Sequence, residues 1–185
     1  MNGVVDLPGP RLEMLRSEVR AASWFAALGE PLSEGDRSDA AAYGASLGFA
    51  AIEIGQARDW PHAECLLKAP DWTPAWWDRE EALRRTALAT AEARYPERAL
   101  WSSLTELTTE AGDLVHGKAA TAAARLGNAA VASIHVAAGA ASQAVLQLAV
   151  ARLAQDAASP FESKFRLFAA GRWPLGILGS RLVVF

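Results

Sequence analysis

The chain has 185 residues, enough for one compact domain with a hydrophobic core of its own. Hydrophobic residues make up 51% and charged residues 21%, a balance that excludes an intrinsically disordered chain. The formal net charge of -3 excludes the simple electrostatic case for nucleic-acid binding, so we expect no nucleic acid as a partner. Alanine accounts for 41 residues, and because alanine favours helices and is depleted in strands, an all-β domain is excluded as well.

Helical patterns dominate the first third of the chain. A first helix is predicted to begin at Pro10, where an apolar stripe with helical spacing follows. Ser38 is the expected N-cap of a second helix that runs to about residue 57. Residues 58–73 are rich in turn-forming residues and are predicted to form a loop.

Proline residues mark the boundaries of the next two helices. Pro74 starts a third helix, which ends near Tyr95 because Pro96 follows it. Pro96 in turn starts a fourth helix, and Gly117 is expected to kink or end this helix.

The longest uncharged stretch lies between Arg125 and Arg152, where 26 residues carry no formal charge. Alanine and glycine dominate it, whereas a membrane-spanning helix needs about 20 strongly apolar residues. The stretch therefore predicts a long buried helix at the centre of a bundle, over residues 128–157, and no association with a membrane.

The C-terminal region changes from helical to extended character. Ser159 and Pro160 combine an N-cap with a proline at the first helical position, which is typical of a helix start. In residues 173–185, two apolar runs flank Gly179 and Ser180, which predicts a β-hairpin. Because an isolated hairpin is only marginally stable in water, we expect this one to pack on the bundle or on a partner.

Together these elements predict an all-α fold, a single domain over residues 1–185 that forms a bundle of five to seven helices.

Cys65 is the one cysteine and cannot form an intramolecular disulfide, so we expect it to be buried and inert in a reducing compartment. The first residues carry neither the basic run nor the apolar stretch of a signal peptide. A cytoplasmic location is therefore expected.

A candidate metal site lies on the fourth helix and the long central helix. One side of the fourth helix carries Glu110, Asp113 and His116. The spacing of Asp113 and His116 is related to the Glu-x-x-His pattern of di-metal bundles. His135 would add a second imidazole. The sequence holds one such motif only, and the apolar stripe of the same helix lies opposite it. The alternative is that the acids face water and that His135 is a hydrogen-bonded core residue.

Aromatic residues supply the second set of candidates. Four of the seven tryptophans fall within 18 residues, and the C-terminal segment adds two further rings; the six are Trp60, Trp72, Trp76, Trp77, Trp173 and Phe185. Indole faces stack on flat ligands and attract cations, and tryptophan is enriched at the centres of protein interfaces. The alternative is structural: large rings that cap a bundle built from small alanine side chains.

No complete catalytic set and no glycine-rich phosphate-binding loop are present in the sequence. We therefore expect a non-catalytic, self-associating protein–protein interaction module, whose partner is a second copy of the chain or another protein. The alternative is a helical bundle that binds a metal or a small ligand, with or without enzymatic activity, through Asp113, His116 and His135 or through the cluster from Trp60 to Trp77. No cofactor is predicted.

Overall fold

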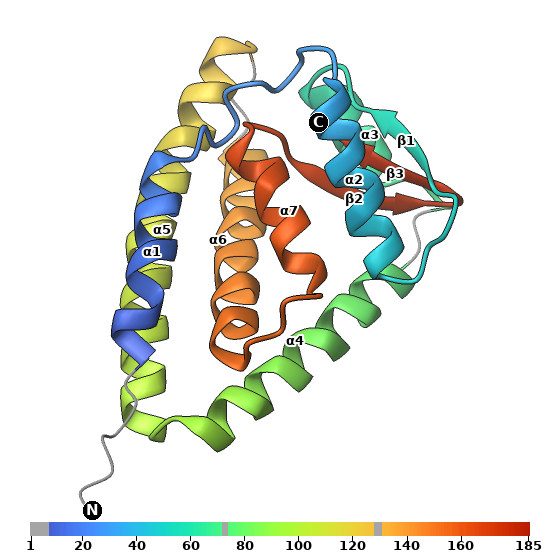
Figure 1. Ribbon diagram of the computed structural model, residues 1–185. Coiled ribbons are helices and arrows are strands. Elements are labelled where there is room, and N and C mark those ends of the chain that lie inside the picture. The colour runs from blue at the N-terminus through green and yellow to red at the C-terminus, as the bar shows by residue number, and fades with distance from the viewer. Residues whose placement is uncertain (1–7, 72–73, 128–130) are drawn as a thin grey trace, which may run out of the picture.

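The structure, a computed structural model, describes residues 8–71, 74–127 and 131–185 (Figure 1). Within these ranges the chain forms seven helices, which are α1 (Pro8–Ala21), α2 (Glu34–Ser46), α3 (Trp60–Leu67), α4 (Ala75–Arg94), α5 (Glu97–Arg125), α6 (Val131–Ala154) and α7 (Pro160–Ala169). The same ranges contain three short strands, which are β1 (Glu53–Gln56), β2 (Pro174–Leu178) and β3 (Arg181–Val184).

Helices α5 and α6 run side by side in opposite directions and form the centre of the bundle (Figure 1). Many of their buried side chains are alanines, namely Ala111, Ala119, Ala122, Ala123, Ala137, Ala138, Ala141 and Ala144. Because a methyl group takes little space, small side chains at a helix contact bring the two backbones close together. Helix α1 packs along α5 and also contacts α6.

Aromatic side chains fill the space that the alanines leave open. Helix α7 packs between α2 and α6, and its Phe165 and Phe168 lie against Trp24, with ring centroids 5.7 Å apart in both pairs. Phe25 packs edge-on against Phe168 at 5.9 Å. All four rings are buried, so they anchor the short N-terminal and C-terminal helices on the alanine-rich centre.

A small sheet with the strand order β1-β3-β2 closes one end of the molecule (Figure 1). Strand β3 lies in the middle, parallel to β1 and antiparallel to β2. All five residues of β2 and three of the four in β3 are buried. The hairpin predicted from the sequence thus has both of its strands inside this chain's own sheet.

A buried arginine ties this end of the molecule to the segment between α1 and α2. Arg172 donates hydrogen bonds to the carboxylate of Asp36 at 3.1 Å, to the carbonyl oxygens of Glu30 and Pro31 at 2.7 Å each, and to the carbonyl oxygen of Ala27. The planar guanidinium suits this arrangement because it presents several donors in a fixed geometry. It satisfies the carbonyl groups of a segment that has no regular secondary structure.

The predicted all-α bundle with a long central helix and a C-terminal hairpin is confirmed. The helix expected after Ser38 is wrong in detail: α2 begins after Ser33, whose side chain forms a capping box with Asp36. It ends at Ser46, and residues 53–56, expected to be helical, form β1. Gly48 and Ala51 have positive φ angles, and they turn the chain so that it can pair with β3.

Two further expectations need correction. The predicted loop over residues 58–73 contains α3, which Asp59 caps through a hydrogen bond from the backbone amide of His62. Helix α5 continues without a break through Gly117. The expected start of the central helix at residues 128–130 lies outside the described residues.

Among the described helices, α6 alone is long and apolar enough to span a membrane by length and composition. In the structure 56% of its most apolar window is buried inside the protein. A buried helix in the core of a soluble bundle also has this length and apolar composition.

Candidate functional site

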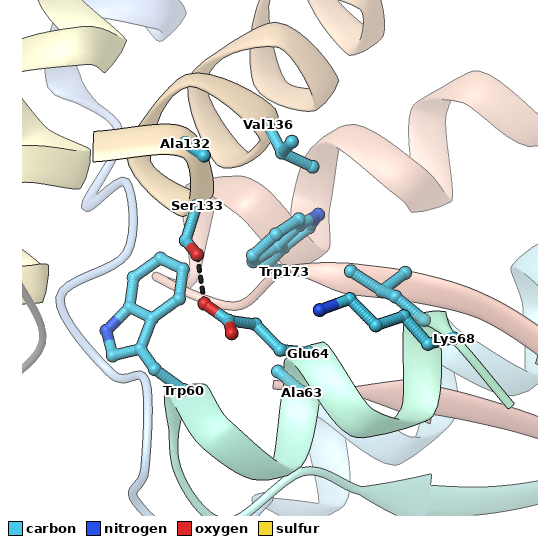
Figure 2. A pocket seen from close by; sticks show the side chains of 9 residues that line it. Trp60, Ala63, Glu64, Lys68, Ala132, Ser133, Val136 and Trp173 are labelled. Carbon is cyan, nitrogen blue, oxygen red and sulfur yellow. Dashed lines mark hydrogen bonds between the residues drawn. The ribbon is translucent and has the colours of Figure 1, made fainter. Parts of the chain in front are cut away.

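A cavity of about 480 Å³ opens between α3 and the first turns of α6 (Figure 2). Its walls are mostly apolar, and they consist of Trp60, Ala63, Glu64, Leu67, Lys68, Ala132, Ser133, Val136 and Trp173. This volume lies within the range of about 300–1,000 Å³ that is typical of sites for small molecules.

Two indole rings form the aromatic part of the wall. The rings of Trp60 and Trp173 lie 5.7 Å apart at an angle of 55°. Trp60 begins α3, and Trp173 is fixed by its backbone, which exchanges hydrogen bonds of 2.7 and 2.8 Å with Phe185. The ring of Phe185 stands edge-on to Trp60 at 5.4 Å, behind the cavity. Helix α3 therefore holds Trp60, and the backbone pairing with Phe185, just before β2, holds Trp173.

Three polar side chains reach the same cavity (Figure 2). Glu64 follows Trp60 by four residues on α3, and Lys68, the C-cap of this helix, follows Glu64 by four more. This spacing places Trp60, Glu64 and Lys68 on the same side of the helix. The hydroxyl of Ser133, in the first turn of α6, donates a hydrogen bond to the carboxylate of Glu64. This position also brings the carboxylate to the positive end of the α6 dipole. In Figure 2 the side chain of Lys68 extends toward Glu64 and Trp173.

A second, smaller cavity of about 180 Å³ adjoins the first, and the two share Leu67, Val136 and Trp173 as lining residues. Trp76, Trp77 and Lys164 also line the smaller cavity. The aromatic surface thus continues from α3, across the start of β2, to the first turn of α4.

Beneath the smaller cavity, a buried polar network joins α2, α4, α6 and α7. The carboxylate of Glu80 accepts hydrogen bonds from Tyr43 at 2.6 Å, from Lys164 at 2.7 and 2.9 Å, and from Gln147 at 3.2 Å. Lys164 donates a further bond of 3.0 Å to the amide oxygen of Gln147. Burial, together with the neighbouring charge of Glu80, raises the pKa of Tyr43 well above its usual value. Each charged group here has partners within the chain, so we assign the network to the fold.

The structure divides the aromatic candidates into two groups. Trp60, Trp173 and Phe185 meet in one buried cluster, and Trp76 and Trp77 form an edge-on pair at 5.9 Å. Of these five, Trp77 is the most exposed, at 40%. Trp72 lies outside the described residues.

The metal candidates come together only in part. The rings of His116 and His135 lie 5.2 Å apart, but Glu110 is engaged in ion pairs with Arg16 and Arg20 at 3.2 and 2.5 Å. Asp113 is exposed on α5. Within the described ranges, no three His, Cys, Asp or Glu side chains are grouped closely enough to hold one metal ion.

Two expectations about single residues are corrected here. His135 is exposed, not a core histidine, because it faces outward beside His116. Cys65 is exposed as well, since it lies on a side of α3 that does not face the bundle.

Glu64, Lys68 and Ser133 were not predicted to line a site. The four-residue spacing of Trp60, Glu64 and Lys68 is a signal that would have been readable once residues 60–67 were recognised as a helix. No local signal connects Ser133 with Glu64, because their contact depends on how α3 packs against α6.

No protein-family model matches the chain, and neither a curated protein nor a solved structure does.

Proposed function

We propose that this protein binds a small organic cation with a flat, apolar body in the cavity between α3 and α6. One observation carries the proposal: the carboxylate of Glu64 is held by Ser133 at the edge of a cavity that two indole rings line. Trp60 and Trp173 are 1% and 3% exposed, so their rings add only a small apolar, polarisable surface to the cavity wall, and the fixed carboxylate supplies the attraction for a positive charge. The volume of about 480 Å³ suits a molecule of this size.

The charges around the cavity favour a positive ligand. Glu64 is half-buried and fixed by its hydrogen bond, whereas Lys68 is exposed at the rim. A charge in a less polar environment interacts more strongly than one surrounded by water. An exposed lysine also keeps its ammonium group in the solvent with little cost. The carboxylate therefore contributes more to ligand preference than the ammonium.

A matched pair of ligands tests this proposal. We expect the protein to bind naphthylmethylammonium more tightly than naphthylacetate in isothermal titration calorimetry, because the two share one apolar ring system and differ in charge. Equal affinity for both ligands, or preference for the anion, contradicts the proposal.

Two valine variants locate the binding site. Val136 lines the cavity and is 54% exposed, whereas Val131 is 63% exposed on the same helix and does not line it. We expect Val136→Trp to block binding of naphthylmethylammonium and Val131→Trp to leave it unchanged. Binding that survives in Val136→Trp places the ligand elsewhere.

The self-associating interaction module stays a prediction. Part of its support was the apolar segment 173–185, which was expected to need a surface to cover it. Strand β3 is the central strand of this chain's own sheet, and Trp173 and Phe185 are buried within the chain. The segment 173–185 therefore does not support self-association. Native mass spectrometry of the purified protein tests the prediction by measuring the oligomeric state.

A further inference from the structure

We propose that His116 and His135 form a two-histidine site for a divalent late transition-metal ion, which bridges α5 and α6. The two imidazole rings lie close together where these helices pack, with centroids 5.2 Å apart and ring planes inclined by 35°. This site is separate from the cavity between α3 and α6, because neither histidine lines that cavity.

The separation of the rings suits a shared metal ion. Imidazole nitrogen binds zinc at about 2.0–2.1 Å, so two imidazoles at tetrahedral positions around one ion have ring centroids about 5.3 Å apart. The observed distance of 5.2 Å matches this value. Zinc, copper and nickel are the divalent ions that imidazole ligands favour.

The histidine pair lies at the protein surface, where water can reach it. Both histidines are exposed, and so is Asp113, which lies one turn before His116 on α5. No third His, Cys, Asp or Glu joins them in the described part of the chain, so water completes the coordination shell. The alanines buried between α5 and α6 bring the backbones close, which allows two short imidazole side chains to meet.

An ion held in this way stabilises the fold. The two ligands come from different helices, so the site exists only where α5 and α6 are packed together. A ligand that binds the folded state in preference to the unfolded state raises the free energy of unfolding as its concentration exceeds its dissociation constant. The melting temperature therefore reports binding without any assumption about biological activity.

The test is a titration of the untagged protein with Zn²⁺ alone, followed by calorimetry and by thermal unfolding. We expect one ion for each chain and a saturable rise in melting temperature. His116→Ala and His135→Ala are each expected to weaken binding by at least about 10-fold, since even the loss of an outer hydrogen-bond partner of a ligand costs this much. Both positions are exposed on helices, where alanine is well tolerated, and circular dichroism checks the fold. If either alanine variant fails to fold, the corresponding glutamine variant takes its place.

The chain supplies matched controls. His62 is the remaining histidine, and it accepts a hydrogen bond from the backbone of Arg58; Cys65, on the same helix, is the one exposed thiol of the described residues. We expect His62→Ala and Cys65→Ser to bind Zn²⁺ as the unaltered protein does. The proposal is overturned if either control loses binding, if either His116→Ala or His135→Ala keeps it, or if the unaltered protein shows no saturable binding.

Discussion

The ammonium group of Lys164 lies 2.7 and 2.9 Å from the two carboxylate oxygens of Glu80, in the interior of the protein. Glu80 is 1% exposed and Lys164 is 4% exposed. Removing two charges from water is costly, and their attraction offsets that cost only when other groups satisfy the remaining hydrogen bonds. Tyr43 and Gln147 supply those bonds here. The network therefore fixes the position of α4 against α2, α6 and α7.

Replacing Lys164 with methionine is expected to lower the free energy of unfolding by about 3–5 kcal/mol, because the carboxylate of Glu80 stays buried without its counter-charge. Urea denaturation followed by circular dichroism measures the change. Lys118, an exposed lysine on α5, provides the control, and Lys118→Met is expected to change stability by no more than about 0.5 kcal/mol. Similar losses in both variants contradict the assignment of Lys164 to a buried ion pair.

Tyr43 is expected to make stability fall in alkaline solution. Burial and the charge of Glu80 raise the pKa of Tyr43 in the folded state. In the unfolded chain the pKa of tyrosine is about 10. Above this pH the folded protein binds more protons than the unfolded chain, so the free energy of unfolding decreases by up to about 1.4 kcal/mol for each pH unit. The stability from this group is complete below about pH 10 and is lost as the pH rises toward its folded-state pKa.

The variant Tyr43→Phe isolates this effect because it removes the titrating hydroxyl. Urea denaturation at a series of pH values between neutral and strongly alkaline gives the free energy of unfolding of both proteins. The stability difference between the unaltered protein and Tyr43→Phe should shrink above about pH 10. A difference that stays constant over this range contradicts the raised pKa.

Two glycines are expected to respond to alanine in opposite ways. Gly176 in β2 has a φ angle of +142°, and a Cβ atom there would lie 2.8 Å from the ring of Trp76. Gly117 in α5 has nothing within 4 Å of such an atom. We expect Gly176→Ala to lower the melting temperature and Gly117→Ala to raise it, with a stability gain of about 0.5–1 kcal/mol in the helix. Thermal unfolding measures both, and a stabilising Gly176→Ala would show that β2 does not pack against Trp76 as described.

Local signals in the sequence were sufficient for several elements. Ser159 and Pro160 define the start of α7, and the interval between Pro74 and Tyr95 matches α4. These boundaries were predictable because the residues that cap or end a helix lie within a few positions of it.

Features that depend on distant partners could not be predicted in the same way. Residues 53–56 form a strand because they pair with β3 at the other end of the chain. His116 and His135 meet because of the antiparallel register of α5 and α6, and Glu64 meets Ser133 because α3 packs on α6. In each case the packing of elements that are distant in the sequence determines the contact, and the pattern of neighbouring residues does not reveal it.

Two charge-removing variants at the cavity, one on α3 and one at its C-cap, test most directly whether the carboxylate of Glu64 selects an organic cation. In calorimetric titrations with naphthylmethylammonium, we expect Glu64→Gln to weaken binding by about 10- to 100-fold, the contribution of a hydrogen bond to a charged group. Lys68→Met should strengthen binding, because it removes a like charge from the rim of the cavity. Unchanged affinity in Glu64→Gln, or weaker binding in Lys68→Met, would contradict the account.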